Sequence, residues 1–368
     1  MYKQRMKTRR IQKQVRRTRK GRGGKFVFQG TYGCTFRPAI KCQGNADRAP
    51  GKVSKLMEAY EASQEYKFHD MIAPLDPDEK YFILPSRICK PEITQNPENN
   101  YNSCSLINIT NKHIDPRLLL STEGGKDLMN LVVFSADLYA FLKGLANLFE
   151  GLIVLHTNEI AHLDIKPSNL VGLKTGSEYA IRYIDFGLST KFADFRALRE
   201  DYPYWPFDAR LVDPYYANAK PASLNPEIEK FYKSLKYGGR KFPNWLWYNE
   251  GRPIFDKNLA TTISELIVEK KIGTKIIIEG CDIFALGRTL SEVYSTNTGH
   301  FYVEKNKVEY NGLPNKYQNG LRDAFSIPFF DLIAKMVGPI VLERPSASMA
   351  LLQYIQILEG AKEFFEGN

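Results

Sequence analysis

The chain has 368 residues, of which 43% are hydrophobic and 25% are charged. A chain of this length and composition can bury more than one substantial core and is typical of soluble globular proteins. It has no run of eighteen apolar residues, so the sequence predicts no membrane span. The N-terminus is basic and no apolar stretch follows it, so no secretory signal is expected.

The net charge of +10 comes from residues 1–25, which contain twelve Lys and Arg residues and no acidic one. The rest of the chain has 39 basic and 41 acidic residues. A basic segment without apolar periodicity predicts a disordered arm. Its charge suits a polyanion, foremost a nucleic acid, then acidic lipid or protein, or a nuclear-import signal. A solvated tail without a partner is the alternative. No aromatic residue follows Tyr2 in the arm, which argues against base-specific binding.

The five cysteines are few, scattered and odd in number: Cys34, Cys42, Cys89, Cys104 and Cys281. This usage favours a reducing, intracellular compartment over a disulfide framework. A zinc site built from Cys42, Cys89 and Cys104 is the less favoured alternative, because no C-x-x-C pair supports it.

A glycine turn follows the first predicted strand. Phe26–Gln29 and Cys34–Phe36 have strand character, and Gly30-Thr31-Tyr32-Gly33 between them has turn chemistry. Backbone N–H groups in a glycine turn can approach phosphate without obstruction by a Cβ atom. The turn alone is a weak motif.

The next predicted strand, Lys52–Lys55, leads into a predicted helix at about Leu56–Ile72. Lys55 in a half-buried strand needs an acidic partner, because an unpaired buried charge is costly. We select Glu65 from the helix, since Phe68, one turn later, is expected to face the core. The other acidic candidates in the helix are Glu58 and Glu61.

Several further elements precede the middle of the chain. Tyr81–Pro85 predicts a strand, residues 89–115 are polar and asparagine-rich and predict a surface insert, and Arg117–Ser121 predicts another strand. Residues 122–128 contain a pair of glycines and predict a bend. The spacing of leucine and phenylalanine across residues 131–160 predicts buried helices.

Residues 162–187 contain the strongest motif of the chain. They open with His162-Leu163-Asp164-Ile165-Lys166-Pro167-Ser168-Asn169 and close with Ile184-Asp185-Phe186-Gly187. Two apolar runs between these segments, separated by a polar turn at 174–177, predict a β-hairpin that brings Asn169 and Asp185 together. With Asp164 they form an oxygen-rich cluster suited to Mg²⁺ and substrate phosphates, and a free carboxylate there can accept a hydroxyl proton. A buried loop whose polar residues only satisfy the backbone is the alternative.

The combination of H-L-D-I-K-P-S-N and D-F-G resembles the catalytic and metal-binding loops of eukaryotic-type protein kinases. The resemblance covers about residues 26–360. It implies an α+β, two-lobed protein-kinase-like fold, with a small β-rich N-lobe and a larger, mainly helical C-lobe. The arm is then residues 1–25, the N-lobe 26–122 with an insert at about 89–115, and the C-lobe 123–368 with a long insert at about 209–280. The resemblance also implies ATP with Mg²⁺ or Mn²⁺ in the cleft, and a protein substrate.

The same resemblance implies a role for each matching residue. The expected catalytic residues are Asp164, which accepts the proton of the substrate hydroxyl, and Lys166, which stabilises the transferred γ-phosphoryl group. Asn169 and Asp185 are expected to hold the metal. The expected nucleotide-binding residues are Gly30, Gly33, Thr35, Val53, Lys55, Glu65 and Val171. Among these, the glycines cover the phosphates, Lys55 tied to Glu65 holds the α and β phosphates, and Thr35 and Val53 contact the adenine.

The chain departs from the family pattern at several positions. Phe28 stands where the first glycine of G-x-G-x-x-G-x-V belongs, and Thr35 where its valine belongs. Leu163 replaces the arginine that commonly receives an activation-loop phosphate, so activity is expected without such phosphorylation. The form D-x-K-P-x-N is similar to serine/threonine kinases and implies transfer to serine or threonine. His162 is expected to be structural and to lie near Phe186.

The resemblance also implies structural ties in the C-lobe. Leu188–Asp208 is the expected activation segment, and Pro206-Phe207-Asp208 loosely resembles A-P-E, with Arg344 as the expected partner of Asp208. The segment 280–287 resembles a kinase helix whose Asp282 caps the backbone of the catalytic loop. Residues 209–280 carry no recognisable motif, and 320–366 predict closing helices.

The arm, the G-T-Y-G-C-T-F-R-P segment and the long inserts are more narrowly similar to serine/threonine kinases of large nucleocytoplasmic DNA viruses. That similarity implies an intracellular setting, in a virion or host cytoplasm, or in the nucleus. The main competing function is a pseudokinase scaffold that binds nucleotide or partners, with the arm binding nucleic acid. A small-molecule kinase of the aminoglycoside type is less favoured, and so is a nucleic-acid-binding protein with an incidental kinase fold.

Overall fold

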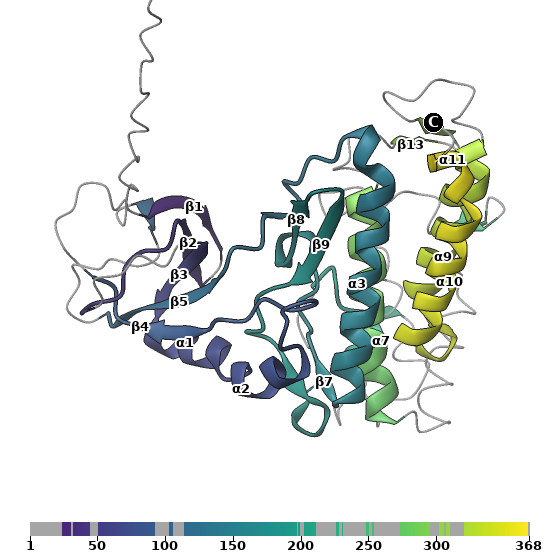
Figure 1. Cartoon of the computed structure of the whole chain (residues 1–368). Coiled ribbons are helices and arrows are strands. Elements are labelled where there is room, and N and C mark those ends of the chain that lie inside the picture. The colour runs from purple at the N-terminus through teal and green to yellow at the C-terminus, as the bar shows by residue number, and fades with distance from the viewer. Residues whose placement is uncertain are drawn as a thin grey trace, which may run out of the picture.

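The computed structural model is mixed α+β and has a two-lobed, kinase-like arrangement, with an antiparallel sheet in the N-terminal region and helices in the C-terminal region (Figure 1). The described residues are 24–30, 32–44, 51–92, 103–105, 114–196, 198, 202–210, 226–227, 230, 248–249, 252–253, 273–294, 302–304, 307–309 and 320–366. The predicted arm up to residue 23 and most of both predicted inserts lie outside the described residues.

Five antiparallel strands form the N-terminal sheet, in the order β1-β2-β3-β5-β4. The strands are β1 (Lys25–Gln29), β2 (Gly33–Arg37), β3 (Lys52–Glu58), β4 (Arg87–Cys89) and β5 (Pro116–Thr122). Helix α1 (Ala59–Tyr66) follows β3 directly and lies along the sheet (Figure 1). Strands β1 and β4 are therefore the two edges.

Alternation along β3 gives this sheet two different faces. On one face, Met57 and Leu119 pack against Ala62 of α1. The residues that alternate with these along the strands point to the other face. There they form a separate cluster, which includes one residue of the asparagine-rich insert. The members of that cluster are Cys34, Phe36, Ile40, Leu56, Cys104 and Leu118. Cys104 therefore lies on the face of the sheet opposite to α1.

Two predicted elements of this region are wrong in part. Strand β3 runs to Glu58, because Glu58 still pairs with Pro116 of β5, so the helix begins at Ala59 rather than at Leu56. The helix also breaks before α2 (His69–Ile72). In the predicted strand Tyr81–Pro85 only Phe82 makes a β-bridge, to Tyr183, because the edge of β5 is taken by β4 instead.

The C-terminal part is built around helix α3 (Leu138–Thr157), whose leucine and phenylalanine side chains are buried in the main core. The C-terminal helices are α7 (Thr274–Glu292), α9 (Ile327–Met336), α10 (Ala347–Gly360) and α11 (Lys362–Glu366). By length and composition alone α3 could cross a membrane, but it packs against β9 (Glu178–Tyr183) and the helices α7 and α10 inside the protein. Figure 1 shows strands β8 (Leu170–Thr175) and β9 on one side of α3 and helices α9 and α10 on the other. The predicted closing helices are thus confirmed, and α7 begins at Thr274, within the last residues of the predicted insert at about 209–280.

The remaining strands are short. They are β6 (Lys126–Asp127), β7 (Ile160–Ala161), β8 (Leu170–Thr175), β9 (Glu178–Tyr183), β10 (Thr190–Lys191), β11 (Tyr248–Asn249), β12 (Arg252–Pro253), β13 (Tyr302–Glu304) and β14 (Lys307–Glu309). Strands β6, β8 and β9 form a three-stranded sheet, and β7 pairs with β10.

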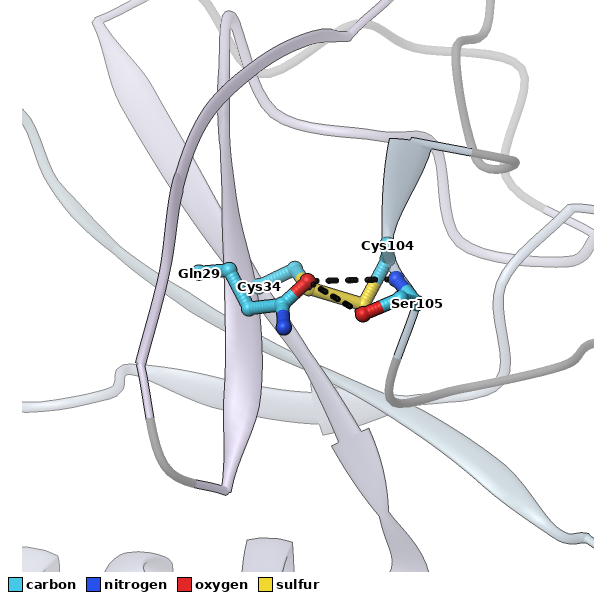
Figure 2. Close-up of a disulfide and its surroundings, with 4 residues drawn as sticks. All are labelled: Gln29, Cys34, Cys104 and Ser105. Carbon is cyan, nitrogen blue, oxygen red and sulfur yellow. Dashed lines mark hydrogen bonds between the residues drawn. A yellow bond between two sulfur atoms is a disulfide. The ribbon is translucent and has the colours of Figure 1, made fainter.

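Four of the five cysteines form disulfides, Cys34–Cys104 and Cys42–Cys89, and Cys281 is free and buried. Figure 2 shows the first of them. The expectation of unpaired cysteines is wrong, and so is the alternative of a zinc site, because all three proposed ligands are bonded to other sulfurs. The paired cysteines are 70 and 47 residues apart in the sequence, so the tertiary structure brings them together.

Candidate active site

The β8–β9 hairpin positions the motif residues. The two strands pair in register from Leu170 with Tyr183 to Thr175 with Glu178. One further backbone bond, from the Ile184 N–H to the Asn169 carbonyl at 3.0 Å, closes the open end. Asn169 and Asp185 therefore flank the same end of the hairpin, as the sequence predicts.

The carboxylate of Asp164 accepts hydrogen bonds from three side chains. Lys166 Nζ lies 2.9 Å from Oδ1 and 2.8 Å from Oδ2, and Asn169 Nδ2 lies 2.7 Å from Oδ2. The Tyr202 hydroxyl lies 3.1 Å from Oδ1. An ionised carboxylate offers about four lone-pair sites, so these contacts occupy all of them. The charge of this buried group is balanced by Lys166.

Lys55 of β3 is held between two carboxylates. Its Nζ lies 2.6 Å from Oε2 of Glu65 in α1 and 3.0 Å from Oδ2 of Asp185. Burial alone would lower the pKa of Lys55, but the charges of Asp185 and Glu65 raise it above its ordinary value. The selection of Glu65 from the sequence therefore matches the ion pair in the structure.

The two carboxylates around Lys55 differ in acidity. Burial raises the pKa of Glu65 to about 7, although the charge of Lys55 opposes the rise. Burial also disfavours ionisation of Asp185, but the attraction of Lys55 and of Lys166 outweighs it and lowers the pKa of Asp185 below its ordinary value. Asp185 is thus the carboxylate that stays charged, and it is the better ligand for a cation.

Two residues of the site have a left-handed backbone, Leu163 with φ 60° and Asp185 with φ 65°. This conformation is unfavourable for a bulky side chain and persists where neighbours hold it. The Leu163 N–H donates to Oδ1 of Asp282 at 2.8 Å, and its carbonyl accepts from Nε1 of Trp205 at 2.7 Å. Asp282 of α7 also accepts from the His162 N–H at 2.9 Å. Asp282 therefore caps the loop backbone, as the motif predicts.

His162 serves this structure rather than proton transfer. Its ring is fully buried, and the ring centroids of Phe186 and Tyr183 lie 4.8 and 5.3 Å away. Burial lowers the pKa of His162, so the ring stays neutral. Its Nδ1 accepts the Asp164 N–H at 3.3 Å. The ring thus fixes the backbone at Asp164, which agrees with the structural role expected of it.

The residues assigned to the nucleotide lie on the α1 side of the sheet. Thr35 stands opposite Lys55 in the β2–β3 ladder, and Val53 is two residues before Lys55, so the three share one face. Val171 of β8 approaches them from the other part of the molecule. A Cβ atom placed on Gly124 would come within 2.6 Å of the Val171 side chain, so the connection between the lobes passes directly over it.

The glycine turn is closed by one backbone bond, from the Gly30 N–H to the Gly33 carbonyl at 2.8 Å. A Cβ atom on Gly33 would lie only 2.6 Å from the Leu56 carbonyl, so no side chain fits there. Gly33 is therefore required by the close packing of β2 on β3. This requirement is separate from the phosphate contact that the resemblance implies.

The oxygen ligands near Asp185 suit a metal ion that also binds phosphate. Among the described residues no cluster of three or more His, Cys, Asp or Glu side chains could hold a metal by itself. Asp185 supplies an ionised carboxylate, and Asn169, whose amide nitrogen bonds Asp164, has its amide oxygen left as a ligand. One carboxylate plus neutral oxygens and phosphate is the ligand set that Mg²⁺ prefers. The site therefore fits the metal only together with a nucleotide.

The start of the activation segment is held by apolar contacts. Leu163 is 4% exposed and packs in a cluster with Phe192 and Phe195 of this segment. The position where kinases of the family commonly have an arginine thus contributes packing instead of charge. Further along, Asp208 and Arg344 form the predicted ion pair, at 3.0 Å with both side chains 1% exposed.

Sequence reasoning missed Tyr202 and Trp205. Tyr202 contacts Asp164, and its ring lies 4.9 Å from that of Trp205, which in turn bonds the Leu163 carbonyl. The dense aromatic run Tyr202-Pro203-Tyr204-Trp205 was the available signal. Without periodicity it does not show which group faces the catalytic loop.

The chain is similar to a protein of Dictyostelium discoideum named "Probable serine/threonine-protein kinase", with 25% identity over 224 residues. The match covers 52% of this chain and 34% of that protein, so the chain spans about a third of the length of this relative. No protein-family model matches the chain. With the two-lobed α+β fold, the similarity supports a protein-kinase-like relationship for this chain.

Proposed function

We propose that this protein is an ATP-dependent protein kinase that transfers the γ-phosphoryl group of ATP to serine or threonine hydroxyls of protein substrates. One observation carries the proposal. Three separate segments bring Lys55, Asp164 and Asp185 to one site, where Lys55 bonds Asp185 at 3.0 Å and Asn169 bonds Asp164 at 2.7 Å. The printed name of the Dictyostelium relative supports the same class of reaction.

In this proposal Asp164 is the proton acceptor. The acceptor hydroxyl gives its proton to Asp164 as its oxygen bonds the γ-phosphorus, and the bond from that phosphorus to the oxygen of the ADP leaving group breaks. Lys166 lies within 2.9 Å of the Asp164 carboxylate, where its charge can also balance the transferred group. Asn169 holds Asp164 in position through its amide nitrogen.

The residues around Lys55 would position the nucleotide. Lys55, kept charged between Glu65 and Asp185, would hold the α and β phosphates. Backbone N–H groups at Gly30 and Gly33 would cover the phosphates, and Thr35, Val53 and Val171 would contact the adenine. Mg²⁺ or Mn²⁺ on Asp185 and Asn169 would neutralise phosphate charge when bound.

The choice of serine or threonine rests on the Asp164-Ile165-Lys166-Pro167 segment, which is similar to serine/threonine kinases. Lys166 extends along the side of the carboxylate that faces Tyr202, with its Nζ 5.8 Å from the Tyr202 ring centre. Phosphoamino-acid analysis of the product tests this part, because phosphotyrosine as the main product would contradict it.

The decisive experiment compares the full-length wild type with Asp185→Ala, using radiolabelled ATP and a mixed protein substrate. Asp70→Asn is the matched control, because the Asp70 side chain is 92% exposed and remote from the motif residues in the sequence. Removing a carboxylate that positions charged phosphate is expected to lower labelling by about 10²-fold or more. Equal labelling by wild type and Asp185→Ala would contradict the proposed kinase activity. The pseudokinase scaffold would then be the remaining hypothesis.

The basic arm is proposed to bind a polyanion, foremost nucleic acid, inside cells, in keeping with the similarity to kinases of large DNA viruses. Residues 1–23 lie outside the described residues, so the support is their charge. Deleting residues 1–25 should abolish salt-dependent nucleic-acid binding and leave phosphoryl transfer intact. Unchanged binding after the deletion would contradict this part alone.

A further inference from the structure

Two residues of the asparagine-rich insert are bonded to the residues that flank the glycine turn. Cys104 forms a disulfide with Cys34, the residue that directly follows Gly33. The neighbouring Ser105 donates two hydrogen bonds to Oε1 of Gln29, the residue before Gly30, from its backbone N–H at 3.1 Å and its hydroxyl at 3.0 Å. Figure 2 shows these contacts side by side. We call Cys104 and Ser105 the loop clamp.

The loop clamp lies on the outer face of the sheet. Cys34 stands opposite Leu56 in the β2–β3 ladder, whereas its neighbour Thr35 stands opposite Lys55. Adjacent residues of a strand point to opposite faces, so Cys34 points away from the face that carries Lys55. The clamp can therefore hold the turn from behind without obstructing the proposed nucleotide site.

The turn has little other support on the side of β1. This strand is at the edge of the sheet, and its ladder with β2 shifts register between Phe26 and Phe28. The side chains of Val27 and Phe28 are 48% and 52% exposed, so packing holds the strand weakly. Within the turn the described bond is that from Gly30 to Gly33. The loop clamp is therefore a main restraint on the shape of the turn.

We propose that Cys104 and Ser105 are positioning residues for the nucleotide, which hold the glycine turn in its phosphate-covering shape while the Cys34–Cys104 bond is intact. The inference rests on the proposed function, because it assumes that this turn covers phosphates. Without the disulfide the turn samples other shapes, and the apparent dissociation constant rises as the inverse of the fraction that keeps the competent shape. Nucleotide affinity then depends on the oxidation state of one cysteine pair.

Release of the clamp is an ordinary thiol–disulfide exchange. A dithiol reductant gives up two electrons and two protons and becomes a cyclic disulfide. Cys34 and Cys104 take up one hydrogen atom each and become thiols. Thiol titration of the unfolded protein follows the reaction, since the structure has one free cysteine, Cys281, beside its two disulfides.

The two disulfides provide matched variants of the full chain. Cys104→Ser removes the disulfide of the loop clamp and keeps Cys42–Cys89, whereas the double variant Cys42→Ser/Cys89→Ser keeps the loop clamp and removes the other bond. The dissociation constant of ATP with Mg²⁺ is measured calorimetrically for each protein with and without dithiothreitol. Thermal unfolding and phosphoryl transfer are recorded on the same samples.

A rise of about three- to tenfold in the ATP dissociation constant is expected for Cys104→Ser, with no further response to dithiothreitol. The Cys42→Ser/Cys89→Ser variant should bind as the wild type does without reductant and should lose affinity by the same factor with it. Gln29→Met, which keeps both disulfides and removes the hydrogen bonds to Ser105, should show a smaller rise.

Equal ATP affinity in Cys104→Ser and wild type overturns the inference, and so does an equal loss in both disulfide variants, which would indicate general destabilisation. If Cys104→Ser does not fold, the reductant response of Cys42→Ser/Cys89→Ser and the affinity of Gln29→Met decide the matter. Nucleotide binding with the expected pattern but no phosphoryl transfer would overturn the proposed function alone. Transfer with a clamp-independent affinity would overturn this inference alone, and a chain that binds no nucleotide in any form would overturn both.

Discussion

The hydroxyl of Tyr202 donates a hydrogen bond to Oδ1 of Asp164 over 3.1 Å. Burial and the charge of Asp164 raise the pKa of Tyr202 well above its ordinary value, so the phenol stays protonated and remains a donor. Lys166 and Asn169 occupy the other lone pairs of the carboxylate. Tyr202 therefore takes the one remaining position that an acceptor hydroxyl would need.

Replacing this tyrosine should ease substrate binding. Tyr202→Phe keeps the ring that packs on Trp205 and removes only the hydroxyl. Because a neutral donor to a charged acceptor contributes about 1.5–3 kcal/mol, the KM for a protein substrate should fall by about tenfold or more, while the KM for ATP stays unchanged. Steady-state kinetics with each substrate varied checks this. A fall in kcat at constant KM would show instead that Tyr202 positions Asp164 for catalysis.

The buried Glu65 should make stability fall as pH rises toward neutrality. Its pKa is raised from 4.5 to about 7 by burial, so between these values the folded state holds a proton that the unfolded state releases. The stabilisation from this proton is complete below about pH 4.5 and is lost as pH rises through about 7. Glu65→Gln cannot titrate, so the difference in melting temperature between wild type and variant should change across this window. Parallel pH curves for the two proteins would rule this out.

Removing one partner of the ion pair between Asp208 and Arg344 should strongly destabilise the folded protein. Both side chains are 1% exposed, and burial raises the pKa of Asp208 despite the nearby guanidinium. Asp208→Asn leaves a buried arginine without its counter-charge and should lower the free energy of unfolding by about 3–5 kcal/mol. Glu150→Gln, in the exposed pair with Lys80, should cost about 1 kcal/mol or less. Denaturant unfolding of both variants measures the difference, and similar losses would contradict the assignment.

The apolar surroundings of Leu163 should make activity independent of phosphorylation in the activation segment. The segment is held there by Phe192 and Phe195, which need no phosphate to pack against Leu163. Protein treated with a phosphatase, and shown by mass spectrometry to carry no phosphate, should retain most of its transfer activity. Complete loss after this treatment, with the fold intact, would contradict the expectation.

Much of the site could be predicted because it depends on local order in the sequence. The hairpin that joins Asn169 to Asp185 follows from two apolar runs and a turn. The Lys55–Glu65 pair follows from the spacing of Glu65 and Phe68 along the sequence, although α1 ends at Tyr66. Neither inference needs knowledge of a distant segment.

The errors arose where a distant partner decides the outcome. Tyr81–Pro85 has the composition of a strand, but the free edge of β5 was already taken by β4. The cysteines appear unrelated in sequence, because each pair joins residues 70 or 47 positions apart that only the tertiary structure brings together. The contact of Tyr202 with Asp164 depends on how an aromatic segment without periodicity folds back, which the sequence pattern does not encode.

Among the described residues, backbone and ionic contacts attach the two lobes at two places, beside the Lys55–Asp185 contact and the packing of Phe68 and Ile72 on the main core. Backbone bonds at 2.8 and 2.9 Å join Tyr183 of β9 to Tyr81 and Ile83, and the chain itself crosses at Glu123–Gly125, where Arg37 of β2 bonds both Glu123 and Gly125. These two attachments define a line, and a rotation of the sheet about it would change the distances between the lobes. Asp185 follows Tyr183 by two residues and lies near this line, whereas Lys55 belongs to the sheet. The 3.0 Å contact between Lys55 and Asp185 would lengthen and shorten with such a rotation, so its length would report the angle between the lobes.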